Sequence, residues 1–299
     1  MPYSHQSRRL LAAIAVTAFG FSVSPAALAE DPVLFQAYTA ESALVVETAP
    51  YEEIIGALSV PENGRTLIAY DVAKAQALPF FSRYVDYLAN VPVEALNRDE
   101  QLAYWLNTRN TLLIQALAEE GRVRGFKRKR GTPQDPGAFW TATRITVAGS
   151  PLSLQEIEEN ILFAGWDDPN IVFGLYQGLK GGPALPRKPF TGANVHAELA
   201  EAGRLFTSES RNFRVRGDKV RISSYFDWYL PLAYGGDERA LRTHLATFAR
   251  AEQQDLVRDS GALDRRNLST DFEQYRTRQA GPGLSSGSGG TRPAGGYGS

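Results

Sequence analysis

The most regular pattern of apolar and polar positions runs from about Arg98 to Glu119 and has the spacing of an α-helix. Its apolar face carries four leucines: Leu102, Leu106, Leu113 and Leu117. Arg109 falls within this apolar stripe, Asn110 lies on its edge and Asn107 lies just beyond it. Burying an unpaired cation is costly. The pattern therefore predicts a core helix in which the Arg109 guanidinium has a partner.

A second predicted helix begins at Ser153, where Ser153 and Glu156 have the spacing of a capping box. Glu158 falls on the apolar face of this helix, so its carboxylate needs a partner as well. We predict that Glu158 meets Arg109 or Asn110 across a helix interface. Two interpretations stay open: a structural polar pair that fixes the helix register, or a functional carboxylate with a shifted pKa.

Shorter patterns predict the remaining elements of an α+β fold, a mostly helical single domain with short strands and β-hairpins. Helical spacing recurs in three further stretches: residues 80–88, 197–206 and 241–255. Alternation of apolar and polar residues around a turn predicts hairpins at residues 141–154 and 213–222. The second hairpin has its two-residue turn at Gly217-Asp218. The apolar run Ile171–Tyr176 predicts a short buried strand.

The first 29 residues have the pattern of a secretory signal peptide. Arg8 and Arg9 precede an apolar run from Leu10 to Val23, and Ala27-Leu28-Ala29 offers small residues for cleavage after Ala29. The run is short for a membrane anchor, and no later run is long and apolar enough to cross a bilayer. We therefore expect a periplasmic or secreted protein without a transmembrane segment once the leader is removed. The export route, general or twin-arginine, stays open.

Pattern and composition together divide the chain into five parts. These are a signal peptide (1–29), a helical N-terminal part (30–96), a core (97–255), a helical C-terminal extension (256–280) and a tail (281–299). The tail consists almost entirely of Gly, Ser, Pro, Ala and Thr, which bury too little apolar surface to offset the entropy of ordering. We therefore expect the tail to be disordered.

Composition excludes several kinds of chemistry. The chain has no cysteine, so disulfides, thiol nucleophiles and thiolate zinc sites are impossible. Beyond the leader only His196 and His244 remain, and neither has a second metal ligand at a typical spacing. There is also no phosphate-binding glycine loop and no Gly-x-Ser-x-Gly motif. We therefore expect neither a metal nor a cofactor.

One segment carries six cations within nine residues: Arg122, Arg124, Lys127, Arg128, Lys129 and Arg130. Such a cluster docks on phosphate or on anionic lipid headgroups, or it is a solvated basic loop, and the sequence leaves both open. Because the chain carries a predicted leader, we do not expect nucleic acid to be a partner.

Three separated motifs resemble segments of the domain of unknown function 547 (DUF547) family. Residues 104–112 read YWLNTRNTL and resemble the family's FWINLYNAL, and residues 147–158 resemble its Gly…LSLDDIE segment. Residues 225–229, YFDWY, resemble its IFxWY close. Order and spacing agree, and the resemblance extends over roughly residues 70–248. The resemblance implies no settled activity, because none is established for the family.

The departures from these family segments concern the residues most suited to chemistry. Gln177 and Gly182 stand where the family has cysteines, Val172 and Glu159 stand where it has histidines, and Arg109 stands for a tyrosine. If the family performs thiol chemistry, this chain lacks the nucleophile.

Two functions follow as alternatives. The leading expectation is a cell-envelope binding or scaffold module with an unidentified envelope partner or ligand. The alternative is an envelope hydrolase with a carboxylate-based site, whose candidate residues are Glu158, Asn107, Asn110, Gln177 and Tyr229. A concave pocket where these groups converge favours the hydrolase. A filled core in which they satisfy one another favours the module.

Overall fold

The computed structural model describes residues 33–62, 65–120, 131–132, 135–261 and 263–266, all within the compact unit Pro32–Ser299. The predicted leader, the six-cation segment and the predicted tail lie outside these residues. Within them helices predominate and the strands form small sheets, so the predicted α+β class is confirmed. Every helix in the described part of the chain is too short or too polar to cross a bilayer.

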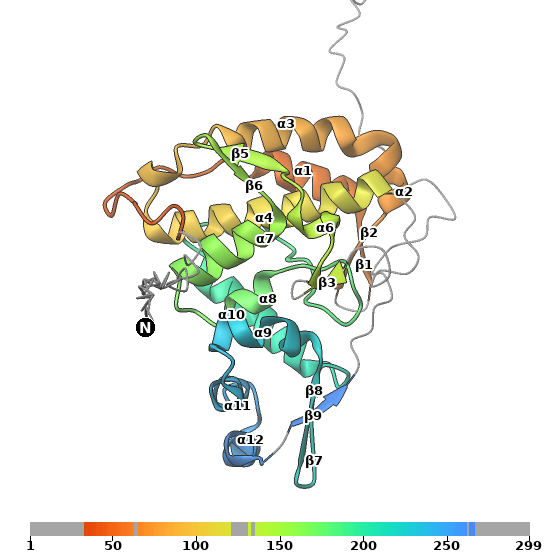
Figure 1. The fold of residues 1–299 in the computed structure, drawn as a ribbon. Helices are drawn as coiled ribbons and strands as arrows, with labels where there is room; N and C mark the ends of the chain where they lie inside the picture. The colour runs from red at the N-terminus through yellow and green to blue at the C-terminus, as the bar shows by residue number, and fades with distance from the viewer. Residues whose placement is uncertain (1–32, 63–64, 121–130, 133–134, 262, 267–299) are drawn as a thin grey trace, which may run out of the picture. The chain divides into compact units, whose positions relative to one another are not determined.

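The centre of the fold is α4 (Arg98–Glu120), which agrees closely with the predicted helix. The sequence predicted one buried face, but α4 is buried almost all round from Glu100 to Ala118. The physical reason is that neighbours contact it on several sides, as Figure 1 shows for α3 and α7. Polar residues on its other faces are therefore also buried and need partners within the protein.

The N-terminal part holds a hairpin as well as helices. Its elements are α1 (Ala49–Leu58), β1 (Ser59–Glu62), β2 (Arg65–Ile68), α2 (Tyr70–Val72), η1 (Ala73–Ala77), α3 (Leu78–Ala89) and η2 (Val93–Ala95). Pro61 of β1 pairs with Thr66 of β2. The hairpin is held by a distant contact, because the Arg65 guanidinium donates to the Glu209 carboxylate at 3.0 Å. No pattern in the local sequence predicts this contact.

The middle of the chain contains the predicted hairpin and the second predicted helix. Its elements are β3 (Gly131–Thr132), β4 (Asp135–Pro136), α6 (Ala138–Thr141), β5 (Ile145–Val147), β6 (Ser150–Leu152), α7 (Leu154–Glu156) and η3 (Ile157–Phe163). The capping box is confirmed: Glu156 N–H donates to Ser153 Oγ at 3.2 Å, and Ser153 N–H donates to the Glu156 carboxylate at 2.7 Å. The helix then widens into a π-helical turn, η3, which carries Glu158.

The strand predicted at Ile171–Tyr176 is wrong. Residues Ile171–Gly174 form a short helix, α8, and all four are buried. A short apolar run does not distinguish a buried strand from a buried helix. The packing here requires a glycine, because a Cβ on Gly174 would lie 2.6 Å from Leu199 Cδ2 and 3.1 Å from Leu106 Cδ2.

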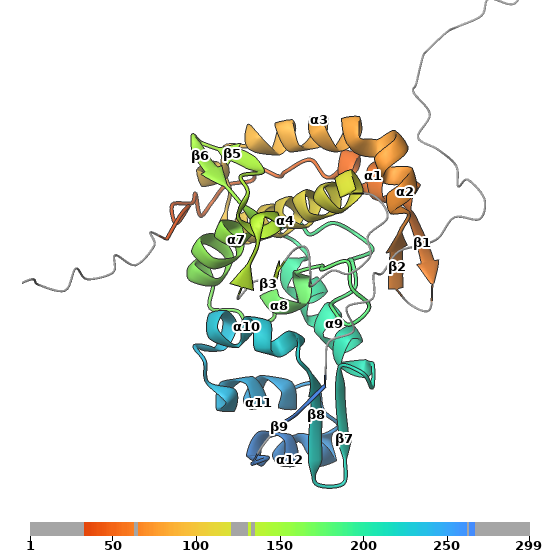
Figure 2. The ribbon, with the colours of Figure 1, turned by 45° about the vertical axis from the view of Figure 1, so that its right-hand side comes forward.

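The C-terminal part combines helices with a three-stranded sheet. Its elements are α9 (Val195–Ser208), β7 (Phe213–Arg216), β8 (Lys219–Ser223), α10 (Tyr225–Tyr234), α11 (Glu238–Ala246), η4 (Ala251–Gln253), α12 (Gln254–Asp259) and β9 (Leu263–Arg266). The predicted β7–β8 hairpin is confirmed. The helix predicted over residues 256–280 is not continuous in the structure. Instead, α12 ends at Asp259, and β9 pairs parallel with β8 (Figure 2). β9 forms because the edge of β8 offers unpaired backbone groups, and no local sequence pattern predicts it.

Candidate functional site

The structure brings Arg109 of α4 against Glu158 of η3 in the interior. Arg109 Nε donates to Glu158 Oε1 at 2.7 Å, and Nη2 lies 2.5 Å from the same oxygen. The Arg109 side chain is 0% exposed and the Glu158 side chain 2%. The Arg109 guanidinium also lies over the Trp140 ring of α6, 5.9 Å from its centroid. The pair is therefore a buried ion pair that packs against an aromatic ring.

Asn110 links this ion pair to the chain that follows α8. Arg109 Nη1 donates to Asn110 Oδ1 at 3.2 Å and also to the carbonyl of Tyr176. The Asn110 amide bonds the backbone on both sides, because Nδ2 donates to the Gly174 carbonyl at 2.8 Å and Oδ1 accepts from Tyr176 N–H at 3.1 Å. Arg109 and Asn110 thus satisfy backbone groups that no regular strand or helix pairs.

The second oxygen of Glu158 faces α10. The Tyr229 hydroxyl donates to Glu158 Oε2 at 3.2 Å, and Gln177 Nε2 donates to the Tyr229 hydroxyl at 2.6 Å. The hydrogen bonds therefore form a chain from Gln177 through Tyr229 to Glu158 and Arg109. We call these four side chains and Asn110 the Glu158 network. Among the described residues, Gln177 Oε1 has no hydrogen-bond partner.

Burial dominates the electrostatics of this network. It raises the pKa of Glu158, although Arg109 and the Tyr229 hydroxyl both favour the ionised carboxylate. Burial also raises the pKa of Tyr229 well above its usual value, and the negative charge of Glu158 acts in the same direction. Tyr229 therefore keeps its proton at neutral pH and serves as a hydrogen-bond donor.

Asn107 is the one predicted candidate that does not join the network. Its Nδ2 donates to the Phe190 carbonyl at 2.7 Å, and its Oδ1 accepts from Phe190 N–H at 3.0 Å. Asn107 therefore fastens the proline-rich loop that precedes α9 onto α4. The six cations of residues 122–130, the other predicted site, lie outside the described residues.

Sequence reasoning did not single out Glu100, which is buried, or the half-buried His244 as polar groups that hold distant segments together. Glu100 in α4 accepts from the backbone N–H of Val46 at 2.8 Å and of Gly192 at 2.6 Å. His244 in α11 lies between the Tyr234 hydroxyl at 2.8 Å and Asn170 Oδ1 at 3.1 Å. Both have distant partners. The only available signal was that Glu100 lies within a strongly helical, apolar segment.

The Glu158 network offers little room for chemistry. Glu158, Asn110, Gln177 and Tyr229 each expose no more than about one per cent of their surface and face one another. Within the described ranges, no group of three His, Asp or Glu side chains has a geometry that holds a metal ion. The arrangement satisfies buried charge and buried backbone rather than presenting a reactive group to solvent.

Comparison with known proteins gives one finding. Residues 93–207 match the model of a family described as "Protein of unknown function, DUF547". This range contains Asn107, Arg109, Asn110, Glu158 and Gln177, while Tyr229 lies beyond it. No curated protein and no solved structure matched the chain.

Proposed function

We propose that this chain, whose residues 93–207 match the DUF547 family model, is an exported cell-envelope protein that acts as a binding or scaffold module. The single observation that carries the choice of module over enzyme is the closure of the Glu158 network. Its polar groups lie against one another in the core, where they serve the fold.

The energetics of the ion pair agree with this role. Two charges leave water at a large cost, and their attraction offsets it only when good geometry and further hydrogen bonds accompany it. Here Glu158 receives donors on both oxygens, and the Arg109 guanidinium also donates to Asn110 and to the Tyr176 carbonyl. The network joins α4, η3, α10 and the segment after α8, so it fixes how these elements pack.

The raised pKa of Glu158 fits the alternative, an envelope hydrolase acting through this residue, but the enclosure of its side chain weighs against it. A catalytic carboxylate must reach substrate or water. Glu158 instead uses both oxygens on protein donors and is almost fully enclosed.

Chemical labelling of carboxyl groups tests the module without knowledge of a ligand. The folded protein is treated with a water-soluble carbodiimide and an amine, and peptides are analysed by mass spectrometry. We expect Glu158 to stay unlabelled, while Glu201, whose side chain is 64% exposed, is labelled. Labelling in urea then shows that the Glu158 peptide is detectable. Comparable labelling of both residues in the folded state would contradict the module and favour the hydrolase.

Export rests on the N-terminal pattern alone and needs its own test. The full chain is expressed in a Gram-negative host, and the intact mass of the protein is measured in the periplasmic and cytoplasmic fractions. We expect a periplasmic species that begins at Glu30. A matched variant with Ala27→Leu and Ala29→Leu keeps the apolar run but removes the small residues, so it should stay uncut. An uncut wild-type chain in the cytoplasm would refute export.

A further inference from the structure

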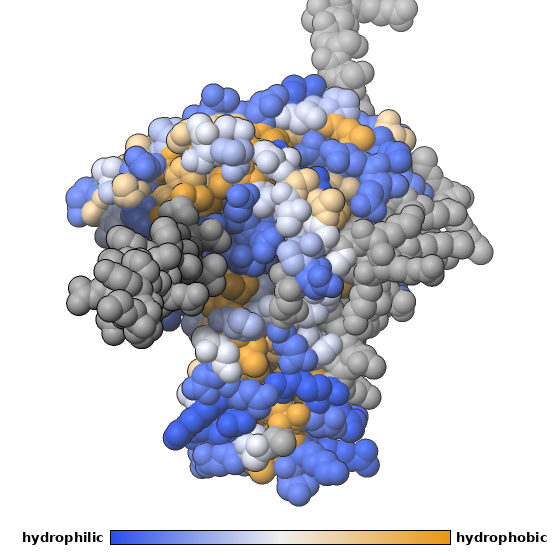
Figure 3. All heavy atoms as spheres, viewed as in Figure 1, coloured by the Kyte–Doolittle hydropathy of each residue, from blue (hydrophilic) through white to orange (hydrophobic). Residues whose placement is uncertain are grey.

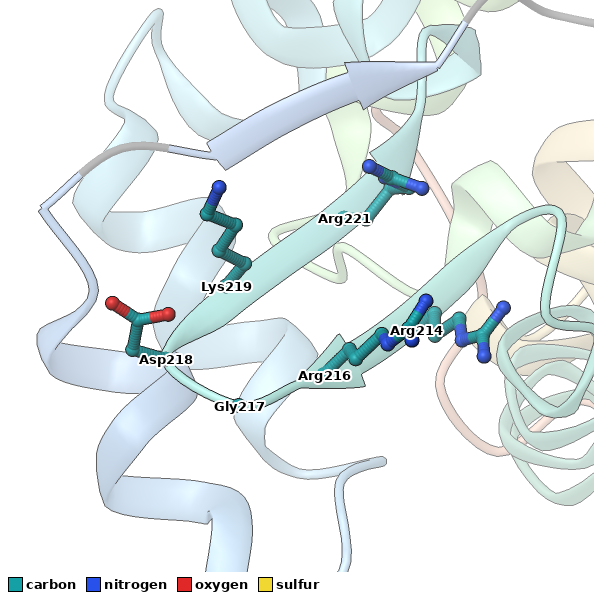
Figure 4. A pocket seen from close by; sticks show the side chains of 6 residues that line it. All are labelled: Arg214, Arg216, Gly217, Asp218, Lys219 and Arg221. Carbon is teal, nitrogen blue, oxygen red and sulfur yellow. The ribbon is translucent and has the colours of Figure 1, made fainter.

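The β7–β8 hairpin presents a face that carries four cations. Arg214 and Arg216 extend from β7, and Lys219 and Arg221 extend from β8, as Figure 4 shows. In the antiparallel register Arg214 lies opposite Arg221, and Arg216 lies opposite Lys219. Directly opposite residues share one face of a sheet, so all four side chains belong to the same face. We call this the basic hairpin face.

Like charges directly opposite each other destabilise a sheet. Only one of the four cations has an acidic partner among the described residues: Arg221 Nε lies 2.7 Å from an Asp264 carboxylate oxygen on β9. No acidic side chain pairs with Arg214, Arg216 or Lys219 within the described ranges. The hairpin thus keeps two cross-strand cation pairs, and among the described residues the pair Arg216 and Lys219 has no acid within ion-pair distance.

The opposite face of the hairpin packs against the core. Phe213, Val220 and Ile222 are buried, and β9 adds a third strand alongside β8. The cations therefore stand on a sheet packed against the core, so binding on this face orders side chains but no backbone. Figure 3 shows mainly hydrophilic residues on the visible surface around α11 and α12.

The basic hairpin face borders a hollow of 530 Å³ that is lined by its four cations, Gly217 and Asp218. This volume lies within the range of small-molecule sites, about 300–1,000 Å³. Arginine presents a planar fork of donors that matches phosphate oxygens, and lysine adds a point charge. The pair Arg216 and Lys219 matches the charge of one phosphate monoester, about −1.5 to −2 at neutral pH. Arg214 lies two residues along β7 from Arg216, about 7 Å away, which is a suitable distance for contact with a second phosphate.

From this geometry we infer that the basic hairpin face is a binding site for a small solute that carries two or more phosphate groups. A membrane surface fits the face less well. Peripheral membrane binding combines basic residues with inserted apolar ones. The large exposed apolar side chains of the described chain are Val33, Tyr38, Leu44, Val45 and Tyr87, none of which lies on the hairpin.

This inference goes beyond the proposed function and does not rest on it. The hairpin lies after residue 207, outside the match to the family model, and it contributes nothing to the Glu158 network. The site therefore stands whether or not the protein is exported.

Isothermal titration calorimetry of the full chain with inorganic tripolyphosphate tests the site. We expect saturable binding that weakens as salt rises. Orthophosphate, which has one phosphate group, should bind at least tenfold more weakly. The double variant Arg216→Gln/Lys219→Gln should lose at least tenfold in tripolyphosphate affinity. The matched control, Lys74→Gln/Arg239→Gln, removes two exposed cations elsewhere and should stay within twofold of wild type.

Thermal unfolding of the same proteins shows whether a loss of affinity comes from loss of the fold. The hairpin variant should melt at the wild-type temperature or slightly above it, because the substitution relieves a like-charge pair. The site is refuted if wild type does not bind tripolyphosphate, or if the hairpin variant and the control lose affinity equally. A sedimentation assay with vesicles that contain an anionic phospholipid forms the second arm. Binding to vesicles without binding to tripolyphosphate overturns the small solute in favour of a membrane surface.

Discussion

Replacing Arg109 by methionine tests the physical account of the Glu158 network. Methionine keeps much of the length and apolar stem of arginine but removes the guanidinium. Glu158 then loses the donor at 2.7 Å and the charge at 2.5 Å, and it keeps only the Tyr229 hydroxyl at 3.2 Å. The Tyr176 carbonyl loses a donor as well.

The expected cost follows from burial. Removing one partner of a buried ion pair typically destabilises a protein by about 3–5 kcal/mol, because the other charge stays buried and uncompensated. The matched control is Arg204→Met, which removes the partner of Glu201 in a pair whose side chains are 61% and 64% exposed. An exposed pair of this kind contributes less than about 1 kcal/mol. We therefore expect a clear gap between the two variants.

Urea unfolding followed by tryptophan fluorescence measures both free energies. Adding Glu158→Gln to Arg109→Met should cost less than the sum of the single variants, with a coupling of up to about 3 kcal/mol. Lower pH should also narrow the gap between Arg109→Met and wild type. Arg109 favours the ionised carboxylate, so without it the pKa of Glu158 in the folded state rises further than in wild type. As the pH falls, the folded variant therefore takes up a proton that the unfolded chain does not, which favours folding. A cost for Arg109→Met no larger than that for Arg204→Met, or strictly additive variants, would refute the buried-pair account.

Three further predictions concern single positions elsewhere. Burial lowers the pKa of His244 to about 4 from its usual 6.5, so the unfolded chain takes up a proton first as the pH falls. Stability should therefore decline from pH 6.5 toward pH 4 by up to about 3 kcal/mol, and His244→Gln should flatten this part of a urea-unfolding profile measured against pH. Gly174→Ala should cost about 1–3 kcal/mol in urea unfolding, because the new Cβ meets Leu199. Gly56→Ala, with open space around the new Cβ, should instead stabilise α1 by about 0.5–1 kcal/mol. Ser153→Ala removes the capping hydroxyl and should lower the melting temperature, at a cost of about 1 kcal/mol, while unchanged melting would contradict the cap.

Helical periodicity was sufficient to predict the two helices that carry Arg109 and Glu158 and the burial of both side chains. The α4 pattern placed Arg109 in an apolar stripe, and the pattern after Ser153 placed Glu158 on an apolar face. Both positions are local properties of a helix with 3.6 residues per turn. The need for partners followed from the cost of burying charge, and in the structure each is the other's partner.

The remaining parts depend on contacts that are distant in the sequence. The apolar run at α8 is a helix because α9 and α10 pack against it, and its sequence is compatible with either element. The parallel pairing of β9 with β8 joins segments about forty residues apart, as does the Arg221–Asp264 ion pair. The role of Tyr229 was equally hidden, because α10 alone does not reveal that its hydroxyl reaches Glu158.

Two departures from the segments that this sequence resembles meet at the same carboxylate. Arg109 stands for a tyrosine and Gln177 for a cysteine, and in the structure both belong to the Glu158 network. A thiol is a weak hydrogen-bond donor, whereas the Gln177 amide donates to the Tyr229 hydroxyl at 2.6 Å and leaves that hydroxyl to donate to Glu158. Arg109 supplies the positive charge that a tyrosine does not. Both side chains therefore supply donors around a buried carboxylate, which supports a structural role for this centre.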